Sequence, residues 1–441
     1  MGQVDVHSLA ATARQAARLW VDGRVTRVTG IMAEASVPGA AIGDVCTIET
    51  PRGSVHAEVA GFAGERVLLM PLGELRGVAA GAWVTRRGVS ADVAVGAGLL
   101  GRIVDGFGRP LDGKPAPLLS ARRPLHGAPP SPIERAPVDQ PLWLGIRAID
   151  GLLTCGQGQR VGIVAGPGVG KTVLLSMIAQ RASADVLVMA LVGERGREVS
   201  DFVRAFTAGP QAARTVVVAA TSDRPALERM RAAWLATSIA EHFRDEGQRV
   251  LLVMDSLSRV AMAQRQVGLA VGEPPTTKGY TPSVFAMLPT LLERAGATAK
   301  GSITGIYTVL AEGDDMSDPI ADAAISILDG QFVLSRSLAG RGHFPAIDVL
   351  RSTSRVMPDV ADRTHQQTAR RAREALQLLA ESEDLINIGA YEPGKNARLD
   401  SAIARKTDLM RFLQQDSDEH TPPAEVLRWL TRVGAALENE R

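Results

Sequence analysis

The residues best suited to do chemistry form a glycine-rich loop that reads Gly166-Pro167-Gly168-Val169-Gly170-Lys171-Thr172. This segment, called the phosphate loop below, stands between an apolar run and a stretch with helical spacing. Such a loop presents backbone N–H groups to an anion, and the helix dipole adds to their effect. Lys171 would neutralise the β- and γ-phosphates of a nucleotide, and the Thr172 hydroxyl would bind Mg²⁺. The strict pattern has glycine where this chain has Ala165, but the other glycines and the Lys-Thr pair keep the chemistry, so we predict phosphate binding rather than an ordinary turn.

Two acidic residues follow other apolar runs. Asp255 ends the run RVLLVMD, and a magnesium shell opposite Thr172 needs such a carboxylate. Glu194 follows LVG, where a parallel sheet assembles ligand sites at its carboxyl edge, and it could orient the water that attacks the γ-phosphate. The spacing alone equally allows Glu194 to be a solvated acid at the start of a helix. Asp255 gains weight only because the phosphate loop is present.

The elements that must position these residues alternate along the middle of the chain. Between 144 and 355, short and almost continuously hydrophobic segments alternate with helical candidates at 171–182, 197–207 and 225–246. Strands of that kind are covered on both faces, and alternation of strand and helix predicts a parallel, doubly wound α/β sheet.

The flanking segments have a different texture. Short Val-rich runs and Gly, Pro or Asp turns over 23–93 predict a small antiparallel barrel or sandwich. The proline-rich stretch 124–137 reads as an extended linker. Helices are expected at three places after Pro358, namely 363–381, 397–415 and 423–437. Residues 5–20 have an amphipathic pattern, and that helix could dock on a partner or fold back on its own domain.

Composition narrows the classes of protein. The 441 residues carry 49 Lys and Arg against 48 Asp and Glu, a formal charge of +1, which argues against binding nucleic acid by bulk positive charge. A 45% hydrophobic fraction excludes intrinsic disorder. No apolar run reaches the roughly 18 residues that cross a bilayer, and the first residues do not form a signal peptide. Cys46 and Cys155 predict neither a disulfide framework nor a zinc site. We therefore expect a cytosolic protein of several domains.

With these motifs placed, the chain resembles the rotary-type ATPase family of F- and V-type catalytic subunits, and specifically the export ATPases of flagellar and type III secretion systems. The resemblance extends from about residue 20 to the C-terminus. The segments that carry it are LVGERGREVSDF, GEPPTTKGYTPSVFAMLPTLLERAG, EGDDMSDPIADAAISILDG and GRGHFPAIDVLRSTSRVMPDV. The resemblance implies Mg-dependent hydrolysis of ATP. It also implies a regulator-binding helix at 1–20, a β-barrel at 21–93, a RecA-like nucleotide-binding domain at 94–358 and a helical domain at 359–441.

The same resemblance implies roles for individual residues. Glu194 is similar to the catalytic glutamate and Arg195 to the arginine that follows it near the γ-phosphate. Arg355 is similar to the arginine finger that enters the neighbouring subunit's site. Phe344 stands where the family usually has a tyrosine that stacks on adenine, and it keeps the aromatic face without the hydroxyl. Without the resemblance, Arg355 would read as a surface ion pair and Phe344 as a core aromatic.

The resemblance also implies partners. It implies a homohexamer with sites between subunits, a coiled-coil stalk protein in the pore facing 264–281, and a dimeric stator-like regulator at the N-terminal helix. It further implies an export gate and chaperone–substrate complexes, at the cytoplasmic face of the inner membrane. No nucleic acid is expected.

Alternatives remain open on the sequence. The segment LTCGQGQRVGI, which contains Cys155, is slightly more similar to the non-flagellar branch than to the flagellar one. A rotary ion-translocating subunit is disfavoured by the export-type residues 272–296. An RNA or DNA translocase needs aromatic residues for base stacking, and the predicted barrel offers only Phe62 and Trp83.

Overall fold

The computed structural model describes residues 22–89, 92–207, 209–311 and 318–436, so the helix expected within 1–20 lies outside the described residues. Two compact units are present. Of the described residues, the first unit holds 22–89, 225–228 and 266–274, and the second unit holds the others.

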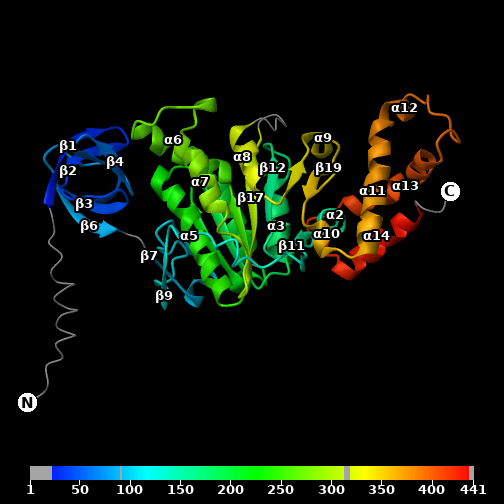
Figure 1. Cartoon of the computed structure of the whole chain (residues 1–441), viewed down its shortest axis with the longest axis horizontal. Coiled ribbons are helices and arrows are strands. Elements are labelled where there is room, and N and C mark those ends of the chain that lie inside the picture. Colours follow the sequence, from blue (N-terminus) through cyan, green and yellow to red (C-terminus); the bar gives the residue numbers. More distant parts are fainter. Residues whose placement is uncertain (1–21, 90–91, 208, 312–317, 437–441) are drawn as a thin grey trace, which may run out of the picture. The chain divides into compact units, whose positions relative to one another are not determined.

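The N-terminal strands form a closed antiparallel barrel in the order β1-β2-β5-β4-β3-β6 (Figure 1). Val25, Cys46, Ile48 and Leu69 are among the side chains that alternation along the strands turns into the barrel core. The predicted small barrel is thus confirmed. Its strands are β1 (Asp22–Thr29), β2 (Met32–Ser36), β3 (Asp44–Thr50), β4 (Gly53–Ala63), β5 (Arg66–Pro71) and β6 (Trp83–Val89).

The second unit is built on a large sheet with the strand order β19-β18-β12-β17-β15-β13-β14-β8. Neighbours on this path are parallel except that β19 is antiparallel to β18. The expected parallel sheet is therefore confirmed with one exception, at its edge. Only the short helix α9 (Arg336–Gly340) stands between β18 and β19, and a short connection suits antiparallel neighbours. The strands are β8 (Arg102–Val104), β12 (Arg160–Ala165), β13 (Val186–Val192), β14 (Thr215–Ala220), β15 (Arg249–Asp255), β17 (Ser302–Leu310), β18 (Gly330–Leu334) and β19 (Ile347–Ser354), with β16 (Gly296–Ala297) beside β17.

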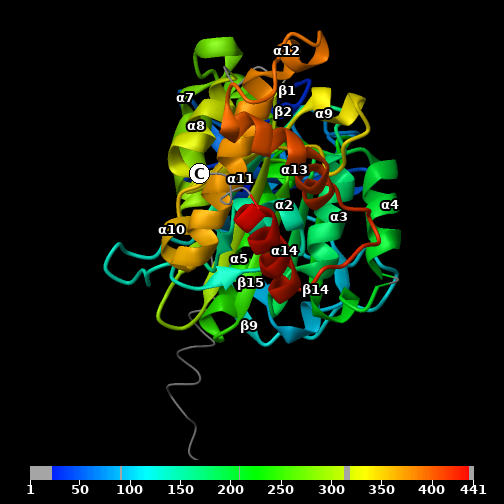
Figure 2. The same cartoon turned by 90° about the vertical axis from the view of Figure 1, so that its right-hand side faces the viewer.

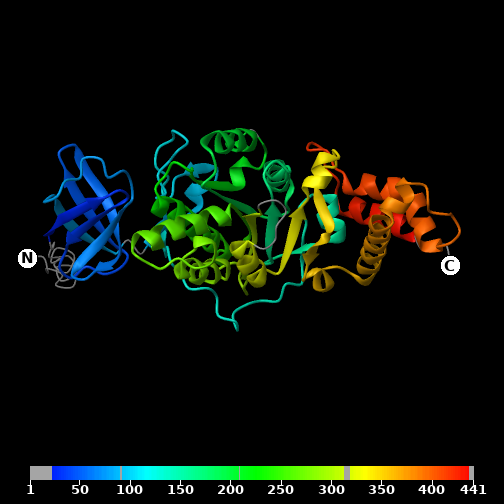
Figure 3. The same cartoon turned by 90° about the horizontal axis from the view of Figure 1, so that it is seen from above.

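Helices cover both faces of this sheet (Figure 3). Along β13, Leu187 and Met189 belong to one apolar core and Val188 and Ala190 to the other, as the twofold period of a strand requires. The first core includes side chains of α3 (Lys171–Arg181) and α4 (Gly196–Thr207). The second includes side chains of α5 (Ala226–Asp245), α6 (Leu257–Ala270), α7 (Pro282–Leu292) and α8 (Pro319–Ile327).

The C-terminal residues form a helical bundle at the β19 edge of the sheet (Figures 1 and 2). Ala369, Ala372, Leu376 and Leu379 form the buried stripe of α11, and Asp362 caps its N-terminus. The bundle shares its apolar core with the sheet, so the boundary expected near 358 marks a change of secondary structure within one compact unit. The C-terminal helices are α10 (Met357–Val360), α11 (Arg363–Glu381), α12 (Glu383–Asn387), α13 (Ala397–Leu413) and α14 (Pro423–Ala436). The short helix α2 (Arg147–Leu152), from earlier in the chain, contacts α11, α13 and α14.

The proline-rich segment after β9 (Ala121–Pro124) forms no helix or strand up to β10 (Pro141–Leu142), as expected of an extended linker. A fully buried arginine anchors its start. Arg294 Nη1 donates to Leu125 O at 2.6 Å, while its Nε and Nη2 atoms bind the two carboxylate oxygens of Glu241 on α5 at 2.7 and 2.6 Å. Among the described helices, none is both long and apolar enough to span a membrane.

Candidate functional site

The phosphate loop connects β12 to α3. Gly168 and Gly170 have φ values of +78° and +90°, a backbone conformation that favours glycine. A Cβ placed on Gly168 would meet no atom within 4 Å, so the backbone is open to an approaching phosphate. Val169 is buried in the core and holds the loop from inside. Ala165 is accommodated because it is the last residue of the strand, where its carbonyl accepts a hydrogen bond from Ala311 N at 3.1 Å.

Lys171 brings the loop and the two predicted acids together. Its Nζ atom lies 2.5 Å from Asp255 Oδ1 and 3.5 Å from Glu194 Oε1. Asp255 ends β15, and its Oδ1 atom also accepts a hydrogen bond from Thr308 Oγ1 at 2.6 Å. Sequence reasoning missed Thr308, because β17 also contains Ser302, Thr304 and Tyr307, and nothing in the sequence distinguishes the one hydroxyl that faces Asp255.

Glu194 follows Gly193 at the carboxyl edge of the sheet. Burial is the main cause that raises the pKa of the Glu194 carboxyl, and the nearby charge of Asp255 raises it further, against the cations Lys171 and Arg259. Glu194 Oε1 is buried and has no hydrogen-bond partner among the described residues, so it can accept a hydrogen bond from a water. Arg259 was not predicted. It lies on α6, and a Cβ on Gly193 would be 2.7 Å from Arg259 Cβ, which explains the glycine.

Arg195 is not part of this cluster. Its side chain is 84% exposed and forms an ion pair with Glu198 at 3.8 Å. Thr172, in the first turn of α3, is also exposed.

Phe344 lies beside the phosphate loop. A Cβ built on Gly170 would be 3.5 Å from the Cδ1 and Cε1 atoms of the Phe344 ring. The ring is 47% exposed, so it is not a core aromatic. Its backbone is tied to the C-terminal bundle, because Gln415 N donates to Phe344 O at 2.9 Å. A half-exposed aromatic face next to a phosphate site is suited to stack on a base.

Arg355 lies at the end of the sheet where β18 and β12 begin, whereas the phosphate loop lies at the end where β12 finishes. Ser354 pairs with Gly330 at the start of β18, and β18 is parallel to β12. The six residues of β12 therefore separate Arg355 from the loop, about 20 Å at roughly 3.3 Å per residue. Arg355 is exposed, and no ion pair of its side chain occurs within the described parts of the chain. One chain cannot bring Lys171 and Arg355 to the same phosphate.

Comparison with known proteins agrees with this geometry. Residues 145–354 match the nucleotide-binding domain of the ATP synthase alpha/beta family, and 25–88 match the beta-barrel domain of that family. Residues 361–432 match the C-terminal domain of the type III secretion ATPase EscN. The chain is 51% identical to the flagellum-specific ATP synthase of Bacillus subtilis, over 93% of this chain and 94% of the relative. The chain belongs to the ATP synthase alpha/beta family.

Other members of this family support a place among the export ATPases. A type 3 secretion system ATPase of Sinorhizobium fredii is 48% identical over 97% of this chain and 95% of its own. The assembled ATPase EscN of enteropathogenic E. coli superposes with a TM-score of 0.90 at 47% identity, covering 93% of this chain and all of EscN. EscN in complex with its central stalk EscO gives a TM-score of 0.87 at 46% identity over the same shares. The predicted fold and ATP hydrolase activity are thus confirmed.

The donor set of this ATPase fits magnesium. Mg²⁺ prefers oxygen ligands and is usually held by one or two carboxylates together with substrate phosphates. Thr172 and Asp255 offer a hydroxyl and a carboxylate beside a loop that is open to phosphate. Within the described ranges, no group of three or more His, Cys, Asp or Glu side chains is placed to hold a metal ion.

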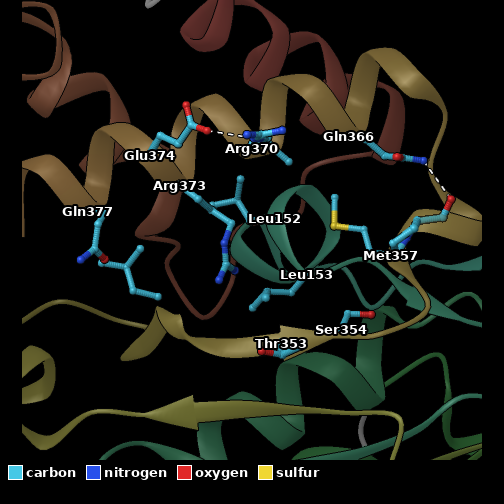
Figure 4. A pocket seen from close by; sticks show the side chains of 13 residues that line it. Leu152, Leu153, Thr353, Ser354, Met357, Gln366, Arg370, Arg373, Glu374 and Gln377 are labelled. Carbon is cyan, nitrogen blue, oxygen red and sulfur yellow. Dashed lines mark hydrogen bonds and ion pairs between the residues drawn. The ribbon is translucent and has the colours of Figure 1, made fainter. Parts of the chain in front are cut away.

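A separate cavity of about 570 Å³ lies between β19, α10 and α11 (Figure 4). Its lining includes Leu152 at the end of α2 and the following Leu153, Thr353 and Ser354 of β19, and Arg373 of α11. It borders the end of β19 that carries Arg355, so it lies apart from the phosphate loop.

Proposed function

We propose that this chain forms a homohexameric ring that hydrolyses ATP between neighbouring copies and energises protein export through a type III secretion system. Release of chaperones and unfolding of substrates are the work proposed for it. The observation that carries the proposal is the position of Lys171 and Arg355 at opposite edges of one sheet. A complete site then needs the phosphate loop of one copy and the arginine of the next.

In this mechanism the chain acts by position and charge, as phosphoryl transfer requires. The phosphate loop binds the phosphates, Phe344 stacks on the adenine, and Lys171 neutralises the oxygens it faces. Bound Mg²⁺, held by Thr172 and Asp255, would neutralise further charge on the phosphates. Glu194 orients the attacking water through its buried Oε1 atom. Arg355 of the next copy stabilises the charge that develops as the γ-phosphate is transferred.

Arg195 has the least support from the geometry. Its side chain is 84% exposed, and its ion pair is with Glu198. We retain it as a residue that could approach the γ-phosphate only after the segment 194–198 moves.

The central stalk is the proposed partner that a solved relative supports. Because EscN assembles with a central stalk, we propose a coiled-coil stalk protein in the pore of this ring, facing 264–281. We also propose a stator-like regulator dimer at residues 1–20, an export gate and chaperone–substrate complexes, at the cytoplasmic face of the inner membrane. The division of the chain at residues 20, 93 and 358 is part of the same proposal.

A flagellum-specific export ATPase is the second candidate. The Bacillus subtilis relative of that kind is 51% identical, against 48% for the secretion ATPase of Sinorhizobium fredii. Copurification distinguishes the two: flagellar export components identify the second candidate, and a non-flagellar stalk and stator identify the first. Copurification with membrane-rotor subunits would reject both.

The shared site is tested by mixing two inactive variants. Arg355→Ala subunits keep the phosphate loop, and Lys171→Ala subunits keep the arginine. A one-to-one mixture assembled into rings should regain up to about a quarter of the wild-type sites. An interface works only when the Arg355→Ala subunit supplies the loop and the Lys171→Ala subunit supplies the arginine, and random assembly gives this arrangement at about one interface in four. Phosphate release is measured, with each variant alone as control. An inactive mixture in rings of normal size, or full activity from lone subunits, would overturn the shared site.

A further inference from the structure

Gln159, the residue before β12, has a completely buried side chain with three hydrogen bonds. Its Nε2 atom donates to Asp329 O at 3.2 Å and to Ser354 Oγ at 3.1 Å. Its Oε1 atom accepts from Gly156 N at 2.9 Å. Both donor hydrogens of the amide are therefore used, and the orientation of the amide is fixed.

The two groups to which the Gln159 amide donates also hold the backbone of Arg355. Asp329 O, which accepts from Gln159, also accepts from Arg355 N at 2.9 Å. Ser354 directly precedes Arg355, and its hydroxyl donates to Thr154 O at 2.8 Å while it accepts from Gln159. One buried amide thus connects both anchors of the turn from which Arg355 projects.

We propose that Gln159 is a positioning residue for Arg355, which sets the place of that arginine in the site of the neighbouring copy. This inference rests on the proposed function, because it assumes that Arg355 acts across the interface. Gln159 itself touches no phosphate. It acts through Ser354 and Asp329.

The packing around this turn makes the polar anchors important. Thr353 and Ser354 line the cavity beside α11, so one side of this end of β19 faces open space instead of packed side chains (Figure 4). Arg355 is itself exposed, so its side chain is not enclosed by packing. The hydrogen bonds from the buried side are then the contacts that fix the backbone of Arg355, from which its side chain extends.

Gly330 shows how closely these groups approach. A Cβ at this position would lie 2.5 Å from Thr353 O, 3.1 Å from Ser354 Cα and 3.3 Å from Gln159 Nε2. Backbone and amide fill the space that a side chain would need, so only glycine allows the arrangement.

A neighbouring ion pair fixes Asp329 as well. Arg160 Nε and Nη2 each lie 3.1 Å from a carboxylate oxygen of Asp329, and Arg160 Nη1 lies 2.5 Å from Glu293 Oε2. The carbonyl and the carboxylate of Asp329 are therefore held by consecutive residues, Gln159 and Arg160. The acceptor that serves Arg355 has little freedom to move.

A competing role is support of the chain's own phosphate loop, since β12 leads from Gln159 to that loop. The mixing design separates the two roles. A Gln159→Leu subunit that only misplaces its arginine still has a working phosphate loop, so it should regain activity with Lys171→Ala and not with Arg355→Ala. A subunit with a damaged loop should show the reverse.

The experiment compares Gln159→Leu with Gln157→Leu, a matched control whose amide donates to Pro141 O and does not contact the Arg355 turn. We expect Gln159→Leu rings to lose about 100-fold in kcat, the effect of misplacing a catalytic group by about 1 Å. The KM for ATP should stay within about twofold, because the binding loop is unchanged. Gln157→Leu should stay within about twofold in both.

Each outcome decides the matter. The proposal is supported if Gln159→Leu regains activity when mixed with Lys171→Ala and does not when mixed with Arg355→Ala. Recovery with Arg355→Ala, or with neither, overturns it, provided that the Arg355→Ala and Lys171→Ala mixture recovers. If that reference mixture stays inactive in assembled rings, the proposed shared site itself is lost.

Should Gln159→Leu fail to assemble, Ser354→Ala is tested in the same mixtures, because it removes only the hydroxyl that Gln159 binds. We expect Ser354→Ala to lose about tenfold in kcat, which corresponds to about 1.4 kcal/mol, because the change removes both hydrogen bonds of the Ser354 hydroxyl.

Discussion

Lys171 and Asp255, 84 residues apart in the chain, lie with Nζ 2.5 Å from Oδ1. The first follows β12 and the second ends β15, and the two strands are separated in the sheet only by β17. The parallel order of these strands brings a cation of the phosphate loop and a metal-binding carboxylate to one edge. Thr308, on the strand between them, binds the same Oδ1 atom.

Replacing Lys171 by alanine should abolish hydrolysis. The change removes the cation that faces the phosphates and leaves Glu194 and Asp255 as uncompensated like charges. We expect kcat to fall by at least about 100-fold, the usual cost of losing one charge-stabilising donor. Phosphate release measures it, and Lys300→Ala, at an exposed lysine, is the control. Appreciable turnover by Lys171→Ala would mean that the chemistry occurs elsewhere.

The Glu194→Gln variant should separate binding from hydrolysis. Glutamine keeps the size of the side chain but loses the charge that orients water, so we expect kcat to fall by about 10² to 10⁴. Binding of a fluorescent ATP analogue should change little, because the phosphate loop is intact. If binding is lost together with turnover, Glu194 supports the loop and is not the group that orients water.

Turnover should depend on pH through Glu194. Burial and the charge of Asp255 raise the pKa of Glu194 above the ordinary glutamate value of about 4.3. The carboxylate form is the active one, so kcat should be highest above the raised pKa and fall as the pH decreases through it. A pH–rate profile on assembled rings measures this decrease. The residual activity of Glu194→Gln should lack it, and a wild-type profile that is flat on the acid side contradicts the assignment.

Phe344 should affect affinity for the nucleotide and not the rate of its hydrolysis. Its ring lies against Gly170 with one face exposed, and stacking on a base contributes about 1–3 kcal/mol. We expect Phe344→Ala to raise the KM for ATP about tenfold with kcat nearly unchanged. Phe344→Tyr, which keeps the ring, should stay within about twofold. An unchanged KM in the alanine variant would place the base elsewhere.

Glu241 should be important for stability. It binds the completely buried Arg294, which also holds the linker at Leu125. Glu241→Ala leaves that guanidinium without its carboxylate, a loss of about 3–5 kcal/mol in the free energy of unfolding. Arg370→Ala is the matched control, since its pair with Glu374 is mostly exposed and contributes below about 1 kcal/mol. Thermal unfolding measures both variants. Equal Tm values would contradict the stabilising role of the buried Glu241–Arg294 pair.

Local patterns were sufficient to place the phosphate loop, Asp255 and Glu194 at the carboxyl edge of the sheet. Each follows an apolar strand, and the carboxyl edge of a parallel sheet gathers such residues whatever the details of packing. The barrel and the helical bundle could likewise be predicted from the spacing of apolar residues, which is about two residues in strands and about 3.6 in helices. The antiparallel direction of β19 could not be predicted in this way. It depends on the short connection through α9 and on β18 having an open side where β19 can pair.

Patterns in the chain, then, determined the chemistry that is local to one loop: glycines that adopt positive φ, a lysine, a hydroxyl, and acids at strand ends. Only the tertiary structure decided where distant residues stand. The register of β18 and β19 places Arg355 at the edge away from Lys171, and the burial of Gln159 against Ser354 and Asp329 follows from that register. The physical reason is range. Backbone conformation is set by a few consecutive residues, whereas strand pairing and burial are set by contacts between segments far apart in the chain.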